Sequence, residues 1–210
     1  MILLDSRLFL LFLAAAALLA VTPGPGIFYV LARTLAGGRR EGILSSLGTF
    51  CGGLLHVLAA ALGLSAILAA SATAFMLVKY AGALYLAWLG LMMIRSRNQE
   101  LVVSHEAPGP RHAFRQGVLT EVLNPKTALF FLSFIPQFVN VQLGHTVTQF
   151  LILGLISVSL NTLADLVVVA LAVPLGRKLA GNRRFRRNQR TATGVAMIGL
   201  GTFVALADTR

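Results

Sequence analysis

The chain has 210 residues, of which 57% are hydrophobic and only 12% charged, and its mean hydropathy is +0.81. A soluble domain of this length has too little interior to bury so much apolar surface, so the composition excludes an ordinary water-soluble protein. The net charge of +11 does not indicate nucleic-acid binding, because the basic residues lie in short gaps between apolar blocks.

Six apolar blocks account for most of the sequence. About 20 apolar residues in a helix span the ~30 Å hydrocarbon core of a membrane, and each block approaches or exceeds that length. The sequence therefore predicts an all-α integral membrane protein with six transmembrane helices. The blocks cover roughly residues 8–31, 43–70, 75–94, 116–139, 147–175 and 191–207.

The first block is interrupted by Pro23, Gly24, Pro25 and Gly26. Proline lacks the backbone donor and displaces a carbonyl of the preceding turn, and in hydrocarbon these groups need partners. Transporters keep such breaks where freed backbone groups line a cavity, so this segment is expected to offer main-chain ligands to carboxylate or ammonium groups. The block continues past the prolines, which makes it too long for the apolar region of a signal peptide.

The second block carries polar residues along one helical face. Ser45, Thr49 and His56 share this face with small residues, which predicts close helix packing. His56 could take up a proton near neutral pH, or it could be a hydrogen-bonded structural group. The residues themselves leave both interpretations open.

A second proline break lies in the fourth block, at Asn124, Pro125 and Lys126, with Glu121 one helical turn before it. The Asn124 side chain offers both a carbonyl and an amide to a ligand or to freed backbone groups. Glu121 and Lys126 are not a same-face helical pair, although a bend at the proline could bring them together. Alternatively, both could extend to water near the end of the helix.

The fifth block contains the sharpest polar pattern, because Ser157, Asn161 and Asp165 recur every four residues along one helical face. An acid in the middle of a membrane costs ~2.5–3.5 kcal/mol, so a partner, water or a bound cation must offset that cost. Asp165 is therefore a candidate ligand for a cation or amino group and a candidate site of proton uptake. The alternative is a structural pair with a basic residue.

The gaps between the blocks alternate in charge. The first, third and fifth gaps are basic, whereas the second and fourth are nearly neutral. Basic loops face the cytoplasm under the positive-inside rule, so both termini are predicted outside, and the basic loops would also attract anionic lipids.

Three predicted helices on each side of the third gap give each half an odd number of crossings. Two homologous halves would then be inverted relative to each other, a 3+3 inverted repeat with proline-broken helices 1 and 4. The segment after Pro25 aligns with the segment after Pro125, which is a trace of such a repeat. Stripes of glycine and alanine would permit a homodimer. The single domain 1–210 divides into half-repeat 1–98, link 99–111 and half-repeat 112–210.

Several classes of chemistry have no signature in the sequence. There is no phosphate-binding loop, no Cys/His cluster and no hydrolase triad in a suitable context. Cys51 is the single cysteine, so no intramolecular disulfide can form. The chain is therefore not expected to be an enzyme or to need a cofactor or a metal.

An ordered set of short motifs runs over nearly the whole chain. The motifs are Thr22-Pro23-Gly24-Pro25, Arg33, Gly37-Gly38-Arg39-Arg40-Glu41-Gly42, Gly48, Lys79-Tyr80-Ala81-Gly82-Ala83-Leu84-Tyr85-Leu86, Phe114-Arg115-Gln116-Gly117, Leu123-Asn124-Pro125-Lys126 and Phe134-Ile135-Pro136-Gln137-Phe138. This ordered set resembles the LysE/RhtB family of amino-acid exporters. The resemblance implies a multi-pass exporter in the bacterial inner membrane, driven by the proton gradient, with both proline breaks in its transport core.

We therefore expect a secondary exporter of amino acids or related small metabolites, with proton antiport as the coupling. Alternatives are a divalent-cation exporter, a membrane scaffold that binds lipid through its arginine-rich fifth gap, and an integral enzyme. The transport core is predicted at Pro23, Gly24, Pro25, Gly26, Asn124, Pro125, Lys126, Asn161 and Asp165, with Asp165, Glu121 and His56 as candidates for proton coupling.

Overall fold

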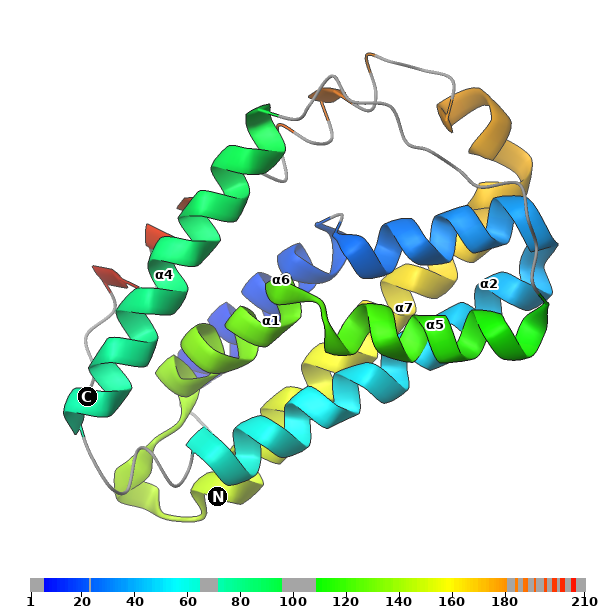
Figure 1. Ribbon diagram of the computed structural model, residues 1–210. Helices are drawn as coiled ribbons and strands as arrows, with labels where there is room; N and C mark the ends of the chain where they lie inside the picture. The colour runs from blue at the N-terminus through cyan, green and yellow to red at the C-terminus, as the bar shows by residue number, and fades with distance from the viewer. Residues whose placement is uncertain are drawn as a thin grey trace.

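The computed structural model describes residues 6–22, 24–64, 72–95 and 109–180, and scattered helical residues between 184 and 206. Its regular structure is all helical, with no strand in the described parts (Figure 1), which confirms the predicted all-α class. The α-helices are α1 (Ser6–Val21), α2 (Pro25–Ala59), α4 (Ala72–Arg95), α5 (Pro110–Val122), α6 (Pro125–Leu129) and α7 (Thr146–Ala180). The π-helical segments are η1 (Ala60–Leu64) and η2 (Phe130–Phe134), and the 3-10 segments are η3 (Ile135–Phe138) and η4 (Val141–Leu143).

Helix α2 folds back on itself at Gly38 and so has two arms. Gly38 has φ 76° and ψ −174°, a left-handed backbone conformation that glycine adopts without a Cβ penalty. Figure 1 shows the first arm running away from α1 and the second arm returning beside α5. The guanidinium of Arg33 pairs with the carboxylate of Glu41 across this reversal, and both residues are buried. The reversal falls in the first predicted gap.

Both proline breaks interrupt the helices where the sequence places them. Helix α1 ends at Val21 and α2 begins at Pro25, while α5 ends at Val122 and α6 begins at Pro125. The segments Pro110–Val122 and Pro125–Phe138 meet at an angle of 42°. Pro23 itself lies outside the described residues. Pro25 and Pro125 each lie in the first turn of the helix that they begin, where the missing N–H is not needed.

By length and composition, two described segments are apolar enough to cross a membrane, Pro25–Gly63 and Thr146–Ala172. The bent pair of Pro110–Val122 and Pro125–Phe138 makes a third candidate if it is one span, and Arg7–Val21 is a shorter apolar helix. Most of the 99–111 link and of the sixth block lies outside the described residues. The six spans and the inverted repeat therefore stay predictions.

The interior is built from close helix contacts and a group of aromatic rings. A Cβ on Gly117 would lie 2.6 Å from the carbonyl oxygen of Ser45, so the second arm of α2 and α5 touch backbone to backbone. Phe12 from α1 packs edge-on against Phe138, with ring centroids 5.4 Å apart. This aromatic group holds α1 against the segment that follows the second break.

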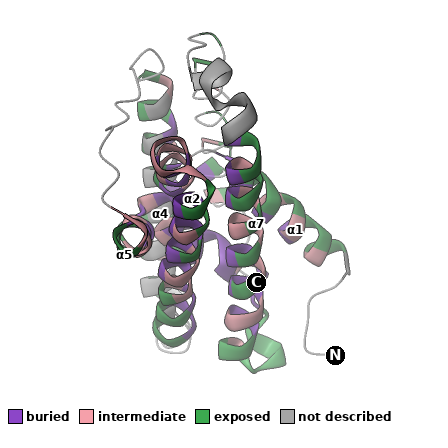
Figure 2. Cartoon of the chain, turned by 90° about the vertical axis from the view of Figure 1, so that its right-hand side faces the viewer, coloured by how far each residue is buried: buried purple, intermediate pink, exposed green. Residues whose placement is uncertain are grey.

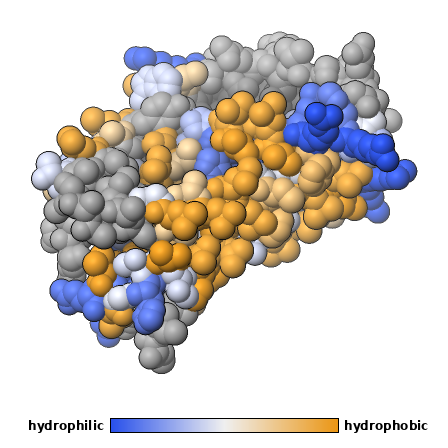
Figure 3. All heavy atoms as spheres, turned by 60° about the horizontal axis from the view of Figure 1, so that its bottom comes forward, coloured by the Kyte–Doolittle hydropathy of each residue, from blue (hydrophilic) through white to orange (hydrophobic). Residues whose placement is uncertain are grey.

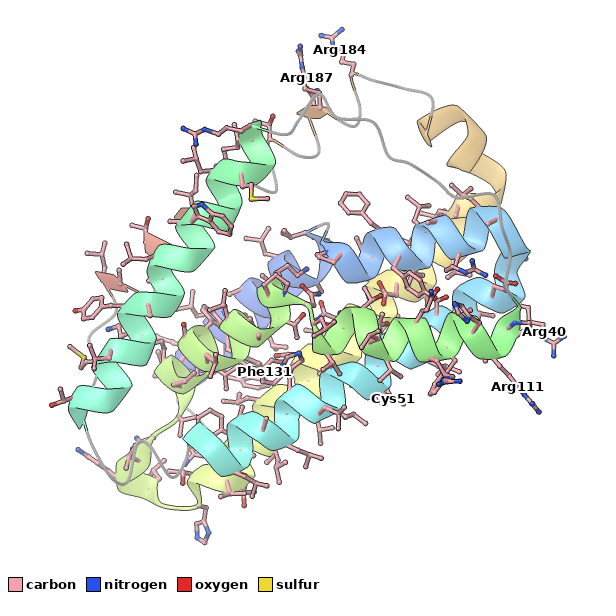
Figure 4. All side chains as sticks on the ribbon, in the orientation of Figure 1. Arg40, Cys51, Arg111, Phe131, Arg184 and Arg187 are labelled. Carbon is pink, nitrogen blue, oxygen red and sulfur yellow. The ribbon has the colours of Figure 1, made fainter. Side chains whose placement is uncertain are left out.

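The outer surface matches a protein surrounded by lipid. Figure 2 shows exposed faces on the outer sides of the helices and buried faces turned toward one another. Figure 3 shows a broad apolar area between hydrophilic patches at two ends of the molecule. Arg40 and Arg111, from the first and third gaps, project from the same end (Figure 4). The predicted topology requires the first and third gaps to lie on the same side of the membrane.

Candidate functional site

The two proline breaks meet inside the molecule, and Lys126 connects them. Its ammonium donates hydrogen bonds to the main-chain carbonyls of Leu19, at 3.1 Å, and Thr22, at 2.8 Å. The Leu19 carbonyl also accepts a hydrogen bond from the Thr22 amide, at 3.1 Å, and the negative end of the helix dipole at the carboxyl end of α1 favours a cation. Lys126 is only 6% exposed. The interpretation that Lys126 extends to water is therefore wrong, because the carbonyls at the break provide a nearer polar partner.

Asn124 organises the second break from within. Its side-chain oxygen accepts a hydrogen bond from the Lys126 amide, at 3.1 Å, and so caps the start of α6. Its side-chain amide donates to Glu121 Oε2, at 3.0 Å. One side chain thus satisfies a freed amide of the following helix and links it to the acid of the preceding one.

Glu121 is held by donors from several positions. Thr127 donates to its Oε1 at 2.6 Å, while Asn124 occupies the other oxygen. His56 Nε2 lies 2.9 Å from the Glu121 carbonyl, so this nitrogen must carry a proton and donate. The His56 ring stacks on Phe131 with centroids 6.0 Å apart. His56 therefore binds the main chain at Glu121 and not the carboxylate of this residue. Glu121 and Lys126 have different hydrogen-bond partners on the two sides of the bend.

Asp165 enters the site from α7. Its Oδ2 lies 2.8 Å from Thr49 Oγ1 on the second arm of α2, and the residue is 6% exposed. Asn161, one turn earlier, is half-buried and faces the same cavity. Ser157 is buried, and its hydroxyl donates to the Leu153 carbonyl at 2.9 Å. The predicted stripe on this helix thus contributes Asp165 and Asn161 to the cavity, while Ser157 bonds to its own helix.

The glycines of the first break provide room for the side chains of the second. A Cβ on Gly26 would lie 2.7 Å from Glu121 Oε2, and one on Gly24 would lie 3.2 Å from Lys126 Cδ. Only a residue without a side chain lets the acid approach the start of α2 so closely. The first break therefore presents bare backbone where the second presents charged and amide groups.

A small cavity of about 20 Å³ lies where these groups meet. It has room for about one water molecule and is far too small for an amino acid. Its polar wall faces apolar groups from α1, α2 and α7. The lining residues are Ala20, Gly26, Ile27, Thr49, Glu121, Asn124, Lys126, Thr127, Val158, Asn161, Thr162 and Asp165.

Most of the predicted core is brought together around this cavity. Gly26, Glu121, Asn124, Lys126, Asn161 and Asp165 line it, Gly24 lies beside the Lys126 side chain, and Pro25 and Pro125 begin the helices. Sequence reasoning missed Thr127 and assigned Thr49 to packing alone. Their signal was a hydroxyl within an apolar block, which is common in membrane helices and becomes specific only when its partner is known. Among the described residues, no three His, Cys, Asp or Glu side chains form a group that could hold a metal ion.

Comparison with known proteins gives a consistent assignment. Residues 17–208 match the family described as LysE type translocator. The chain is 31% identical over 206 residues to an uncharacterized membrane protein of Vibrio cholerae, covering 97% of this chain and 99% of the relative. It is 30% identical to the uncharacterized membrane protein YrhP of Bacillus subtilis, covering 94% and 98%.

A further relative carries a functional name. The chain is 32% identical over 145 residues to the leucine efflux protein of Enterobacter sp. (strain 638), covering 68% of this chain and 69% of that protein. No solved structure matches the chain.

Proposed function

The chain belongs to the LysE type translocator family, and we propose that it exports amino acids or related small metabolites across the bacterial inner membrane. The family consists of transporters, not enzymes, and the homologues are membrane proteins. The relative named leucine efflux protein makes leucine the first substrate to test. The observation that carries the proposal is the meeting of two broken helices at one buried polar cluster.

The cluster has groups of both signs that a zwitterion would need. The carboxyl end of α1 and the Asp165 carboxylate suit an ammonium group, whereas the Lys126 ammonium suits a carboxylate. The cavity is also lined by Ile27 and Val158. These apolar side chains favour a substrate with an aliphatic side chain.

Alternating access is the mechanism we infer for this site. Because the cavity has room for only about one water molecule, an amino acid can bind there only after a movement of the helices enlarges it. Lys126 would leave the carbonyls of Leu19 and Thr22 and turn toward the substrate carboxylate. The predicted inverted repeat would let the two halves rock around the fixed site, with basic loops in the cytoplasm and both termini outside.

Asp165 is the residue we propose for proton coupling. A carboxylate that binds either a proton or the substrate's amino group releases one when it takes up the other. A proton moving inward gains ~2.3 kcal/mol per 100 mV, which is enough to drive accumulation of substrate outside. We expect Asp165→Asn to abolish the dependence of transport on an imposed proton gradient. Unchanged gradient-driven transport in this variant would remove Asp165 from the mechanism.

The direct test is efflux of labelled amino acids from proteoliposomes, beginning with leucine. The wild type is compared with Asn124→Ala and Asp165→Asn, each checked for membrane insertion. We expect gradient-driven leucine efflux in the wild type and its loss in both variants. If no amino acid moves under an imposed gradient, the proposed substrate class is wrong. Anionic lipid in the vesicles and the oligomeric state are varied in parallel, because lipid dependence and a homodimer are also predicted.

A further inference from the structure

We propose that Thr49 is a positioning residue that lets the buried Asp165 gain and lose a proton without losing its hydrogen-bond partner. The inference rests on the proposed role of Asp165 in proton coupling. Thr49 is 5% exposed and belongs to the second arm of α2, whereas Asp165 belongs to α7. The contact therefore joins two helices at the cavity wall.

The Thr49 hydroxyl faces two acceptors at equal distance. Its Oγ1 lies 2.8 Å from Asp165 Oδ2 and 2.8 Å from the main-chain carbonyl of Ser46. A hydroxyl has one proton to donate and also has lone pairs that accept. It can therefore donate to only one of these two oxygens at a time.

Each protonation state of Asp165 fits one orientation of this hydroxyl. When Asp165 is ionised, Thr49 donates to the carboxylate, and the Ser46 carbonyl keeps the helical bond that carbonyls within an α-helix already make. When Asp165 takes up a proton, the carboxyl O–H donates to Thr49 Oγ1, and Thr49 turns its own proton to the Ser46 carbonyl. The Thr49 O–H bond is never broken, and the proton comes from the cavity and returns to it.

This arrangement matters because both states of a buried acid need a partner. The ionised carboxylate is costly without a hydrogen-bond donor, and the O–H of the protonated carboxyl group is costly without an acceptor. The other charged groups at the cavity have partners of their own. Glu121 from α5 accepts from Asn124 and Thr127, and Lys126 from α6 donates to carbonyls of α1 and the residue after it. His56 on the same arm of α2 donates to the Glu121 carbonyl behind the cavity.

The first test follows the protonation of Asp165 without any transport. The infrared carbonyl band of a protonated carboxylic acid is recorded against pH in the purified protein, and the Asp165 contribution is assigned by its loss in Asp165→Asn. Thr49→Val keeps the shape of the side chain and removes the hydroxyl. Thr49→Ala, which also removes the hydroxyl, replaces it if the valine variant is unstable. Thr34→Val is the matched control, because Thr34 is a buried threonine of α2 whose hydroxyl donates to Val30 within its own helix.

We expect the Asp165 band in Thr49→Val to titrate about one pH unit higher than in the wild type, because the charged form loses a stronger hydrogen bond than the neutral form does. Thr49→Ser, which keeps the hydroxyl, should titrate like the wild type, and so should Thr34→Val. An unchanged midpoint in both Thr49→Val and Thr49→Ala would overturn the proposal.

The second test is the pH profile of leucine efflux down its own concentration gradient in proteoliposomes, because efflux driven by an imposed proton gradient is expected to be lost in Asp165→Asn. We expect the profile of Thr49→Val to move in the same direction by a similar amount, with the profiles of Thr49→Ser and Thr34→Val unmoved. If Asp165→Asn keeps a wild-type pH profile, the proposed coupling has failed. If Asp165→Asn flattens the profile while Thr49→Val leaves it unshifted, coupling by Asp165 stands and the role of Thr49 is refuted.

Discussion

Each proline break leaves main-chain groups without helical partners, and the two breaks satisfy these groups in opposite ways. The first, between α1 and α2, contains glycines and no ionisable side chain. Two main-chain carbonyls beside this break accept hydrogen bonds from the ammonium of Lys126, which belongs to the other break. At the second, between α5 and α6, the partners come from the break itself, because the Asn124 side chain caps α6 and donates a hydrogen bond to Glu121. The second break therefore supplies hydrogen-bond partners both for its own main-chain groups and for those of the first break.

One break thus contributes main-chain groups to the site, and the other contributes side chains. Gly26 occupies the position that aligns with Lys126 in the predicted repeat, and the smallest residue thus faces the groups of the second break. Two identical breaks could not pack in this way, because two charged side chains would compete for the same space. Substitutions at the second break should consequently disturb both breaks, whereas substitutions at the first should be more local.

The largest effect is expected for Lys126→Met. It removes the charged donor of two buried carbonyls in the other half of the chain, and we expect a loss of about 1–3 kcal/mol in stability together with loss of efflux. Thermal unfolding in detergent and leucine efflux measure the two effects. Arg40→Met removes a cation that is exposed at one end of the molecule and should leave the unfolding midpoint nearly unchanged. Equal midpoints for the two variants would show that the first break does not depend on Lys126.

A smaller effect is expected for Asn124→Ala. The loss of a helix cap costs about 1 kcal/mol, and the Glu121 carboxylate also loses a donor. Asn140→Ala provides the matched comparison, because Asn140 accepts from the amides of Gln142 and Leu143 at an exposed position away from any site residue. We expect both variants to lose some stability and only Asn124→Ala to lose efflux. Comparable efflux from the two would mean that Asn124 acts as a cap alone.

The smallest change in stability is expected for Gly26→Ala. Alanine is favoured over glycine in a helix by about 1 kcal/mol, which offsets the displacement of the Glu121 carboxylate by the new methyl group. Efflux should fall nonetheless, because the carboxylate can no longer approach the start of α2. In Gly24→Ala the new methyl meets the flexible stem of Lys126, so efflux should fall less. The reverse order would contradict the asymmetry between the two breaks.

The local parts of this architecture could be predicted because they follow from short-range chemistry. Pro25 and Pro125 begin helices since proline fits the first turn and breaks later ones, and Asn124 was already a candidate to satisfy freed backbone groups. The role of His56 could not be decided in this way. Its hydrogen bond to the Glu121 carbonyl depends on how α2 and α5 pack, which the close contacts of their glycines control.

The order of residues alone predicts a helical membrane protein, the positions of its two breaks, and the polar residues that a membrane interior would not hold without partners. The identity of those partners follows from the packing of the helices. Lys126 binds carbonyls more than one hundred residues away, and Thr49 and Asp165 come from helices separated by 116 positions. Hydropathy locates the apolar segments along the chain and says little about the rotation of a helix or its register against a neighbour. Hydrogen bonds between helices depend on both, so they appear only when the helices are packed.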